Sequence, residues 1–369
     1  MHTRCAKVAR SGGPKNVSTL PTSTLAVMST RIVPLHSKSA VRRAGETIAD
    51  ADATAVEVSE AKEIVSNFRS SHGYPLIGVT MHVRQRALQV NPNAVVAQRL
   101  KRLPTIVDKL ERYPKMNVTT MQDLGGSRVI FPTVAEVEKL VSELENATRA
   151  QNIIVRKYDY IRGDPGPKGT GYRGIHLVYE YRASQVEYHG LKVEVQIRTD
   201  LQHAWATAVE TMDLFSGSEL KYSKADPDLQ RYFSVAGSLM AHAEGTTPVP
   251  GAEGSVDELR AELRKLEKKH GIVGRLRGYA AIVSEHAKSN RRSTLTLELR
   301  RKESELRVTV HESLADAEKR LAALEALNDD NLDVVLVGIS KVGQLQAAYP
   351  NYYANTEVFT HFVDVQLAT

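Results

Sequence analysis

Residues 192–198 alternate apolar and polar side chains, and the polar positions hold Glu194, Gln196 and Arg198. Successive side chains of a β-strand point to opposite faces, so this pattern predicts a strand that presents a carboxylate, an amide and a guanidinium on one surface. Such a surface needs either a ligand or a hydrogen-bonded network. The segment is therefore the first candidate for a site that does chemistry.

A second segment upstream is expected to supply further polar groups to that surface. Residues 163–171 are too rich in Gly and Pro for a helix or a central strand, which predicts a shaped loop that delivers Lys168 and Tyr172. His176 follows in the next expected strand, where the alternative is a satisfied histidine on a half-buried face. Loop and strand together indicate a nucleotide-handling core.

These two segments resemble the guanosine-binding loop and the following glutamate strand of the RelA/SpoT alarmone-synthetase family. The resemblance extends from about Phe68 to Tyr222. It implies an ATP-dependent pyrophosphokinase, that is, a diphosphotransferase that moves pyrophosphate from ATP to a ribose hydroxyl. It also implies an α/β fold with a mixed sheet flanked by helices, as in nucleotidyltransferases.

The resemblance identifies Asp123 and Glu194 as the catalytic, Mg²⁺-binding carboxylates. Glu194 can bind the metal or help to activate the attacking hydroxyl. Two carboxylates that offer only oxygen ligands suit Mg²⁺ better than zinc. For Asp123, which precedes Gly125 and Gly126, the alternative is an ordinary turn former.

Four basic residues match the ATP-binding set of the family: Arg99, Lys101, Lys109 and Arg128. Pyrophosphate transfer needs cations around the triphosphate, and these side chains would supply them. The alternative for the first three is a charged helix face exposed to solvent.

Five residues match positions of the family that contact the acceptor: Lys168, Tyr172, His176, Gln196 and Arg198. The Tyr172 ring would stack on the acceptor base, as aromatic platforms do for any base, so stacking alone does not select guanine. After Trp205, itself expected in the core, the family has a Glu-His pair, whereas this chain has Glu210 displaced by one residue and no His. The acceptor therefore stays open.

The C-terminal part of the chain carries a second resemblance. Its cysteine-free layout, with Tyr349 and Tyr352 three residues apart, resembles CapRel-type fused toxin-antitoxin proteins, in which a toxic small alarmone synthetase precedes an antitoxin domain related to a zinc-finger fold without metal ligands. The resemblance implies that the two tyrosines block the ATP site and that a phage structural protein binds this domain. The alternative is ordinary core aromatics.

Three functions remain open. The first is an autoinhibited toxin of an antiphage system that transfers pyrophosphate to the 3′-hydroxyl of the tRNA CCA end and blocks translation. The second is a (p)ppGpp synthetase that uses GDP or GTP, and the third is a binding module without catalysis. For the first, Lys221, Lys224 and Arg231 would steer RNA phosphates, unless they form a merely solvated surface.

Composition agrees with a polyanionic partner. The 369 residues carry a net charge of +6, and 42% are hydrophobic, enough for a full core. One cysteine, Cys5, excludes a disulfide framework and a cysteine zinc site within the chain. We find no signal peptide or membrane span, and expect a cytoplasmic protein that binds neither membrane nor DNA.

Periodicity predicts three regions: a flexible leader at 1–45, a pyrophosphokinase domain at 46–250 and a small α+β antitoxin or regulatory domain at 251–369. The expected helices are 51–68, 75–90, 93–112 divided by Pro104, 134–150, 201–215, 256–270, 272–288 and 314–327. The expected strands are 127–131, 153–160, 175–181, 192–198, 293–299, 306–311 and 334–339. Residues 216–256 are expected to connect the two domains.

Overall fold

The computed structural model describes residues 31–113, 115–147, 152–216, 227–274, 276–277, 293–300, 305–311, 313–327, 329, 332–339 and 356–369. The chain divides after Arg31 into two units, and the second, Ile32–Thr369, contains every helix and strand that the structure describes. None of these helices has an apolar stretch long enough to span a lipid bilayer.

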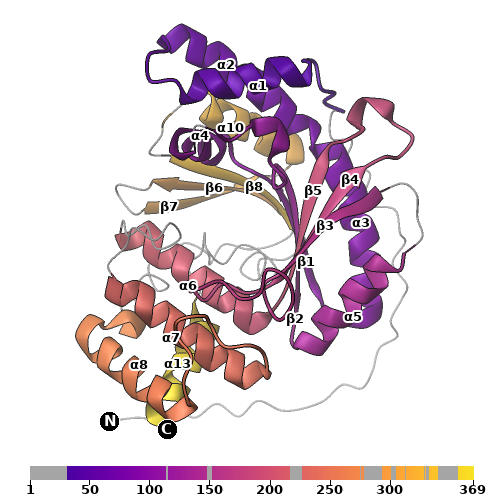
Figure 1. Ribbon diagram of the computed structural model, residues 1–369. Helices are drawn as coiled ribbons and strands as arrows, with labels where there is room; N and C mark the ends of the chain where they lie inside the picture. The colour runs from indigo at the N-terminus through magenta and orange to yellow at the C-terminus, as the bar shows by residue number, and fades with distance from the viewer. Residues whose placement is uncertain are drawn as a thin grey trace, which may run out of the picture. The chain divides into compact units, whose positions relative to one another are not determined.

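A five-stranded mixed sheet forms the centre of the first part of this unit (Figure 1). Its order is β1-β2-β5-β4-β3, and β2 and β5 run parallel while the other pairs are antiparallel. The expected mixed sheet is confirmed. The strands are β1 (Val95–Leu100), β2 (Gly125–Phe131), β3 (Asn152–Asp159), β4 (Ile175–Tyr181) and β5 (Lys192–Thr199).

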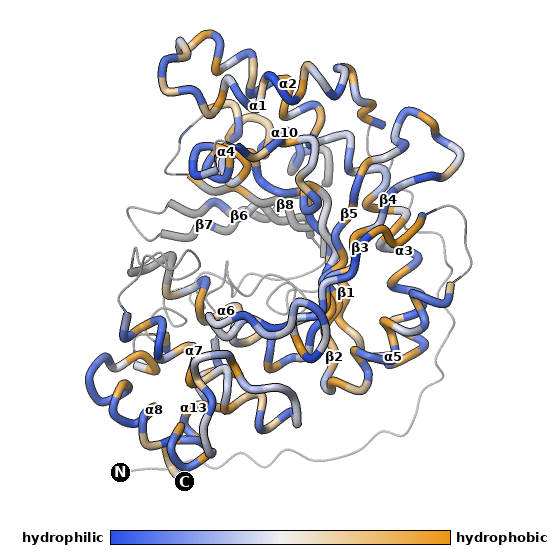
Figure 2. The backbone as a smooth tube through the Cα atoms, viewed as in Figure 1, coloured by the Kyte–Doolittle hydropathy of each residue, from blue (hydrophilic) through white to orange (hydrophobic). Residues whose placement is uncertain are grey.

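The two faces of the sheet differ, as the alternation in β5 predicts. Val193, Val195 and Ile197 are fully buried in an apolar cluster beneath α3 (Gly73–Val90) and α5 (Val134–Glu145). Figure 2 shows apolar and polar residues alternating along α5, whose apolar side meets the sheet. The opposite face keeps the polar side chains and holds the candidate site.

The expected helix 93–112 is wrong. Residues 95–100 form β1 and pair with β2, and a separate helix, α4 (Leu103–Arg112), follows. Pro104 lies in the first turn of α4, where its missing N–H costs nothing, so it begins the helix and does not divide one. Pairing with a neighbouring strand outweighed the helical spacing of the apolar residues.

The expected flexible leader 1–45 is wrong from Lys38 onward. Ser37 accepts a hydrogen bond from the Ala40 backbone and caps α1 (Lys38–Ala49). This helix shares a core with α2 (Ala55–Ser71) and with α4. Two short 3-10 helices complete this part of the chain, η1 (Val118–Thr120) and η2 (Val186–Tyr188).

The expected connection 216–256 is also wrong, because α7 (Pro227–Glu244) lies within it and every residue from 232 to 241 is buried. Its small residues suggested a loop, but they allow close approach: a Cβ on Gly237 would lie 3.0 Å from the Gly171 Cα. The helix packs in one apolar core with α6 (Asp200–Ser216), α8 (Val256–His270) and α13 (Glu357–Ala368).

The expected α+β arrangement appears in the C-terminal part. Three antiparallel strands, in the order β7-β6-β8, pack with α10 (Leu314–Glu325). The strands are β6 (Ser293–Arg300), β7 (Glu305–His311) and β8 (Leu332–Ile339). The helical core nevertheless contains residues from both sides of position 250, so the domain division at 250 stays a prediction.

Candidate active site

A pocket opens on the polar face of the sheet, where β1, β2 and β5 lie side by side. It brings together six of the residues expected from the sequence, including both carboxylates. The lining residues are Ala97, Gln98, Arg99, Lys101, Asp123, Gly126, Ser127, Arg128, Glu194 and Gln196.

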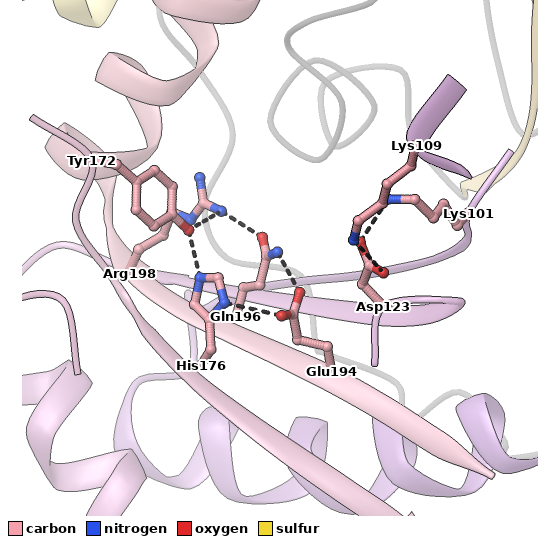
Figure 3. Close-up of polar contacts among 8 residues, drawn as sticks. All are labelled: Lys101, Lys109, Asp123, Tyr172, His176, Glu194, Gln196 and Arg198. Atoms are coloured by element: carbon pink, nitrogen blue, oxygen red, sulfur yellow. Dashed lines mark hydrogen bonds and ion pairs between the residues drawn. The ribbon is translucent and has the colours of Figure 1, made fainter. Parts of the chain in front are cut away.

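Five side chains beside this pocket form a closed ring of hydrogen bonds (Figure 3). The Tyr172 hydroxyl lies 2.6 Å from Nε2 of His176, and Nδ1 of His176 lies 3.1 Å from Oε1 of Glu194. Gln196 donates Nε2 to the other Glu194 oxygen at 2.7 Å. Arg198 donates to the Gln196 carbonyl and, at 3.3 Å, to the Tyr172 hydroxyl. The polar side chains of β5 thus find hydrogen-bond partners in one another and in Tyr172 and His176.

The ring fixes the ionisation of Glu194. Burial raises the pKa of this carboxyl, but the hydrogen bond and charge of His176, with the amide of Gln196, bring the pKa below its ordinary value. A carboxylate can only accept, so Nδ1 of His176 donates to it. Nε2 of the same ring lies within hydrogen-bond distance of the Tyr172 hydroxyl. The ring therefore orients a charged carboxylate at the pocket wall.

Asp123 lies in the same pocket and is held by two of the expected ATP-binding lysines. Nζ of Lys101 lies 2.6 Å from Oδ2, and Nζ of Lys109 lies 3.6 Å from Oδ1 (Figure 3). Burial raises the pKa of Asp123, yet the two ammonium groups keep it below its ordinary value. The lysines come from the loop after β1 and from α4, which excludes the alternative of one charged helix face.

The two carboxylates fit a magnesium ion. Oδ1 of Asp123 is buried and accepts no hydrogen bond, so it has coordination capacity left. The charge of Asp123 raises the pKa of Glu194, as expected for two acids that share a pocket. Among the residues that the structure describes, no group of three or more His, Cys, Asp or Glu side chains could hold a metal alone. Mg²⁺ that binds one or two carboxylates together with substrate phosphates matches this donor set.

The pocket is lined by a buried guanidinium group that an anion would neutralise. Burial, with the charges of Arg198 and Arg99, lowers the pKa of the Arg128 guanidinium well below its ordinary value. Nε of Arg128 and Nε of Arg198 are buried without a hydrogen-bond partner. Buried donors of this kind are costly, and Arg128 lines the pocket, so an anionic ligand there would offset the cost of burying its guanidinium.

Helix α7 packs against the loop of residues 163–171 and fixes its shape. Gly171 has a φ of +99°, and a Cβ there would lie 2.9 Å from the Phe233 carbonyl and from the Trp205 ring. Trp205 is buried and donates to the same carbonyl at 2.9 Å, so its expected core role is confirmed. Ser234 of α7 donates to the Gly169 carbonyl at 2.9 Å. The expected loop therefore has a fixed shape.

Tyr160 is a site residue that sequence reasoning missed. Its ring meets the edges of Tyr172 and His176, with centroids 5.8 and 5.2 Å apart, and Nζ of Lys168 lies 4.5 Å from its centroid. No local pattern marks it, because residues 153–160 do not alternate apolar and polar side chains and the pairing of β3 with β4 shifts register between Ile154 and Arg156.

Five further residues that the sequence analysis singled out are not among those that line the pocket in the described part of the chain, and four of them fall outside it. Tyr349 and Tyr352, together with Lys221 and Lys224, lie outside the described residues. Arg231 pairs with Glu262 of α8 at 2.6 Å, and its expected role in steering RNA stays a prediction.

Comparisons with known proteins agree with the sequence motifs. Residues 98–214 match the family model of the region found in RelA/SpoT proteins. Uncharacterized proteins from Mycobacterium bovis and Mycobacterium tuberculosis are 26% identical over 211 residues, 56% of this chain and 71% of theirs. Residues 98–214 are therefore similar to the region found in RelA/SpoT proteins, which supports a pyrophosphotransferase with a nucleotide-binding site.

Two solved structures are also similar over about half of the chain. The small alarmone synthetase 1 of Bacillus subtilis bound to its product pppGpp has a TM-score of 0.42 and 23% identity, and covers 49% of this chain and 92% of its own. The small alarmone synthetase 2 of Bacillus subtilis has a TM-score of 0.41 and 21% identity, and covers 49% and 94%.

Proposed function

We propose that this chain is an ATP-dependent pyrophosphokinase that modifies the 3′-hydroxyl of the tRNA CCA end and is held inactive by its C-terminal region. The observation that carries the transferase is one pocket in which Asp123 and Glu194 face a set of buried or half-buried cations. These are the groups that pyrophosphate transfer requires.

On ATP binding, Lys101 and Lys109 exchange Asp123 for the triphosphate, and Arg99 and Arg128 neutralise the remaining charge. Asp123 and Glu194 would hold Mg²⁺, which supplies further neutralisation of the phosphates when it is bound. Release of the Asp123 carboxylate and binding of the triphosphate by Lys101 and Lys109 therefore occur together. ATP binding is therefore coupled to opening of the Lys101–Asp123 pair.

The acceptor ribose would lie between Tyr172 and Glu194. Its hydroxyl oxygen attacks the β-phosphorus of ATP, the bond from that phosphorus to the α-phosphate oxygen breaks, and AMP leaves. The hydroxyl proton passes to Glu194, which His176 and Gln196 orient through hydrogen bonds of 3.1 and 2.7 Å. The bound triphosphate raises the proton affinity of Glu194, so the carboxylate becomes a better base once ATP is in place.

The acceptor assignment rests on charge and on one departure from the family pattern. The chain has a net charge of +6, and the Glu-His pair expected after Trp205 for guanine nucleotides is absent. The second candidate is a (p)ppGpp synthetase that uses GDP or GTP, which the RelA/SpoT region itself favours. A binding module without catalysis is a third and explains least, because both carboxylates and their cations are present.

The regulatory part of the proposal follows the CapRel-type layout. Tyr349 and Tyr352 would occupy the ATP site, and a phage structural protein bound to the C-terminal region would release them in the cytoplasm. A contact between the regions supports this coupling. Arg69 donates Nε to the Lys101 carbonyl at 2.6 Å, and its guanidinium lies 3.5 Å from Glu325 of α10. A shift of α10 would therefore reach the loop that carries Lys101.

Transfer of label from ATP tests the proposal. We would incubate the full chain and a Tyr349→Ala/Tyr352→Ala variant with γ-labelled ATP, Mg²⁺ and either tRNA or GDP and GTP. The expected result is labelled tRNA, more with the double variant, and none when periodate has destroyed the tRNA 3′ end. Label in guanine nucleotides alone would establish the second candidate, and no label in any acceptor would refute transfer.

Substitution is preferable to truncation in this test. Leu259 and Leu263 of α8 and Phe359 and Val363 of α13 are buried in the core that α6 and α7 form. A chain that ended near residue 250 would expose that core, so a loss of activity would not be informative. The two tyrosines can be changed without removing those helices.

A further inference from the structure

A second aromatic surface continues from the acceptor site towards the edge of the sheet. The rings of Tyr158 and Tyr160 are parallel within 7°, with centroids 6.1 Å apart. We infer that they bind the nucleotide that precedes the acceptor nucleotide in a single-stranded RNA 3′ end. The inference rests on the proposed function and extends it to a second base.

The geometry joins the two surfaces. Tyr158 lies opposite His176 in the antiparallel pairing of β3 with β4, and the Tyr160 ring meets the edges of both Tyr172 and His176. The rings of Tyr172, Tyr160 and Tyr158 therefore follow one another at centroid distances of 5.8 and 6.1 Å. Because β3 is the last strand of the sheet, this aromatic path leads from the pocket to the edge of the sheet, where Asp159 forms a bridge with Pro165 of the loop.

Charge favours a nucleic acid strand as the occupant. Lys168 is exposed, and its Nζ lies 4.5 Å from the Tyr160 centroid and 5.2 Å from that of Tyr172. Arg156 occupies the alternate position before Tyr158 on β3, so its exposed side chain shares the face of the two tyrosines. Aromatic rings interleaved with cations are the means by which proteins hold single-stranded nucleic acids.

A mononucleotide acceptor would leave Tyr158 without a role. Tyr172 alone suffices to stack one base, and Tyr160 packs against it and against His176. The only aromatic neighbour that the described residues give Tyr158 is Tyr160. Tyr158 lies on the edge strand β3 and Tyr160 directly after it, and both are half-buried, so part of each side chain is exposed to solvent. A second base is the ligand that this surface fits.

Binding of a short RNA to the full chain tests the inference. The probe is a fluorescent single-stranded oligoribonucleotide that ends in ACCA, titrated in the presence of a non-hydrolysable ATP analogue. Tyr158→Ala should weaken binding by about five- to 150-fold, since a base on an aromatic ring contributes about 1–3 kcal/mol. Tyr158→Phe should restore it, because the ring remains. Tyr113→Ala, at an exposed tyrosine after α4, is the matched control and should bind as the unchanged chain does.

Arg156→Ala provides a second readout that does not depend on packing, because this side chain is exposed. It should weaken binding and reduce the dependence on salt by about one phosphate contact. If the unchanged chain binds the probe and labels tRNA while the Tyr158→Ala and Arg156→Ala variants do so equally well, the inference is overturned and the proposed function stands. If the unchanged chain binds only guanine nucleotides and not the probe, both fail.

Discussion

Replacing Asp123 by Asn separates the structural role of this carboxylate from its proposed catalytic role. Asn keeps the shape of the side chain and removes the charge that pairs with Lys101 at 2.6 Å and Lys109 at 3.6 Å. The Lys101–Asp123 pair is largely shielded from solvent, with the Lys101 side chain 13% and the Asp123 side chain 27% exposed. The substitution therefore leaves two ammonium groups in the pocket without their counter-charge.

The expected loss of stability is moderate. A hydrogen bond to a charged group contributes about 1.5–3 kcal/mol, and Asn retains a weaker acceptor, so we expect a decrease of about 1–2 kcal/mol in the free energy of unfolding. Burial already lowers the pKa of Lys101, which lets the lysine lose its proton more readily once Asp123 is gone. The variant should fold.

Pyrophosphate transfer and ATP binding without Mg²⁺ should change in opposite directions in the Asp123→Asn variant. Transfer should fall by about a hundredfold or more, because a carboxylate for Mg²⁺ is lost. Binding of ATP without Mg²⁺, measured by calorimetry in EDTA, should become tighter, because Lys101 and Lys109 no longer have to leave Asp123. Asp108→Asn, which breaks the 2.7 Å pair with Arg112 on α4, is the control and should change the free energy of unfolding by at most about 0.5 kcal/mol. Weaker ATP binding in EDTA, or normal transfer by the Asp123→Asn variant, would refute the exchange of partners.

Three other substitutions test the fold around the site. Gly171→Ala should cost about 1–3 kcal/mol in urea unfolding and weaken acceptor binding, because the φ of +99° and the 2.9 Å approach to Phe233 exclude a side chain; an unchanged midpoint would contradict this. Burial lowers the pKa of His72 from 6.5 to about 4, so below pH 6.5 the unfolded chain binds a proton that the folded chain does not. The free energy of unfolding should therefore be highest above pH 6.5 and fall by up to about 3 kcal/mol as the pH drops from 6.5 to 4. His72→Gln should flatten that part of the stability profile relative to the unchanged chain. Leu263→Ala should cost about 2–5 kcal/mol and shift one cooperative transition that includes α6 and α7, whereas an independent domain after residue 250 would unfold separately.

Much of the site could be predicted from local patterns. The two-residue period of β5 placed Glu194 and Gln196 on one face, and the strand has that arrangement with its apolar side chains fully buried. The Gly- and Pro-rich composition of residues 163–171 indicated a shaped loop, and Gly171 has the backbone conformation that only glycine adopts readily there. Both signals are local, so the sequence alone carries them.

The errors arose where contacts between distant segments decide the structure. The apolar residues of 95–100 also fit a helix, and only pairing with β2, about thirty residues away, makes them a strand. The small residues of α7 suggested a connection, but they are small because the helix packs against the Gly171 loop at backbone distance. In both cases the partner that explains the composition lies elsewhere in the chain. The function of Tyr160 was missed for the same reason, since its neighbours come from β4 and from the loop.

The two carboxylates of the pocket, Glu194 and Asp123, are stabilised by different kinds of partner. Glu194 accepts hydrogen bonds from His176 and Gln196, and both donors can stay in place while a substrate approaches this carboxylate. Asp123 is paired with Lys101 and Lys109, so an anion that takes the lysines away frees the oxygen that Lys101 holds and adds it to the coordination capacity of Oδ1. Any segment or partner that holds Lys101 on Asp123 would therefore keep the pocket inactive while leaving the acceptor side intact. Under the proposed regulation, the C-terminal region would act on that step through the link from Lys101 through Arg69 to Glu325.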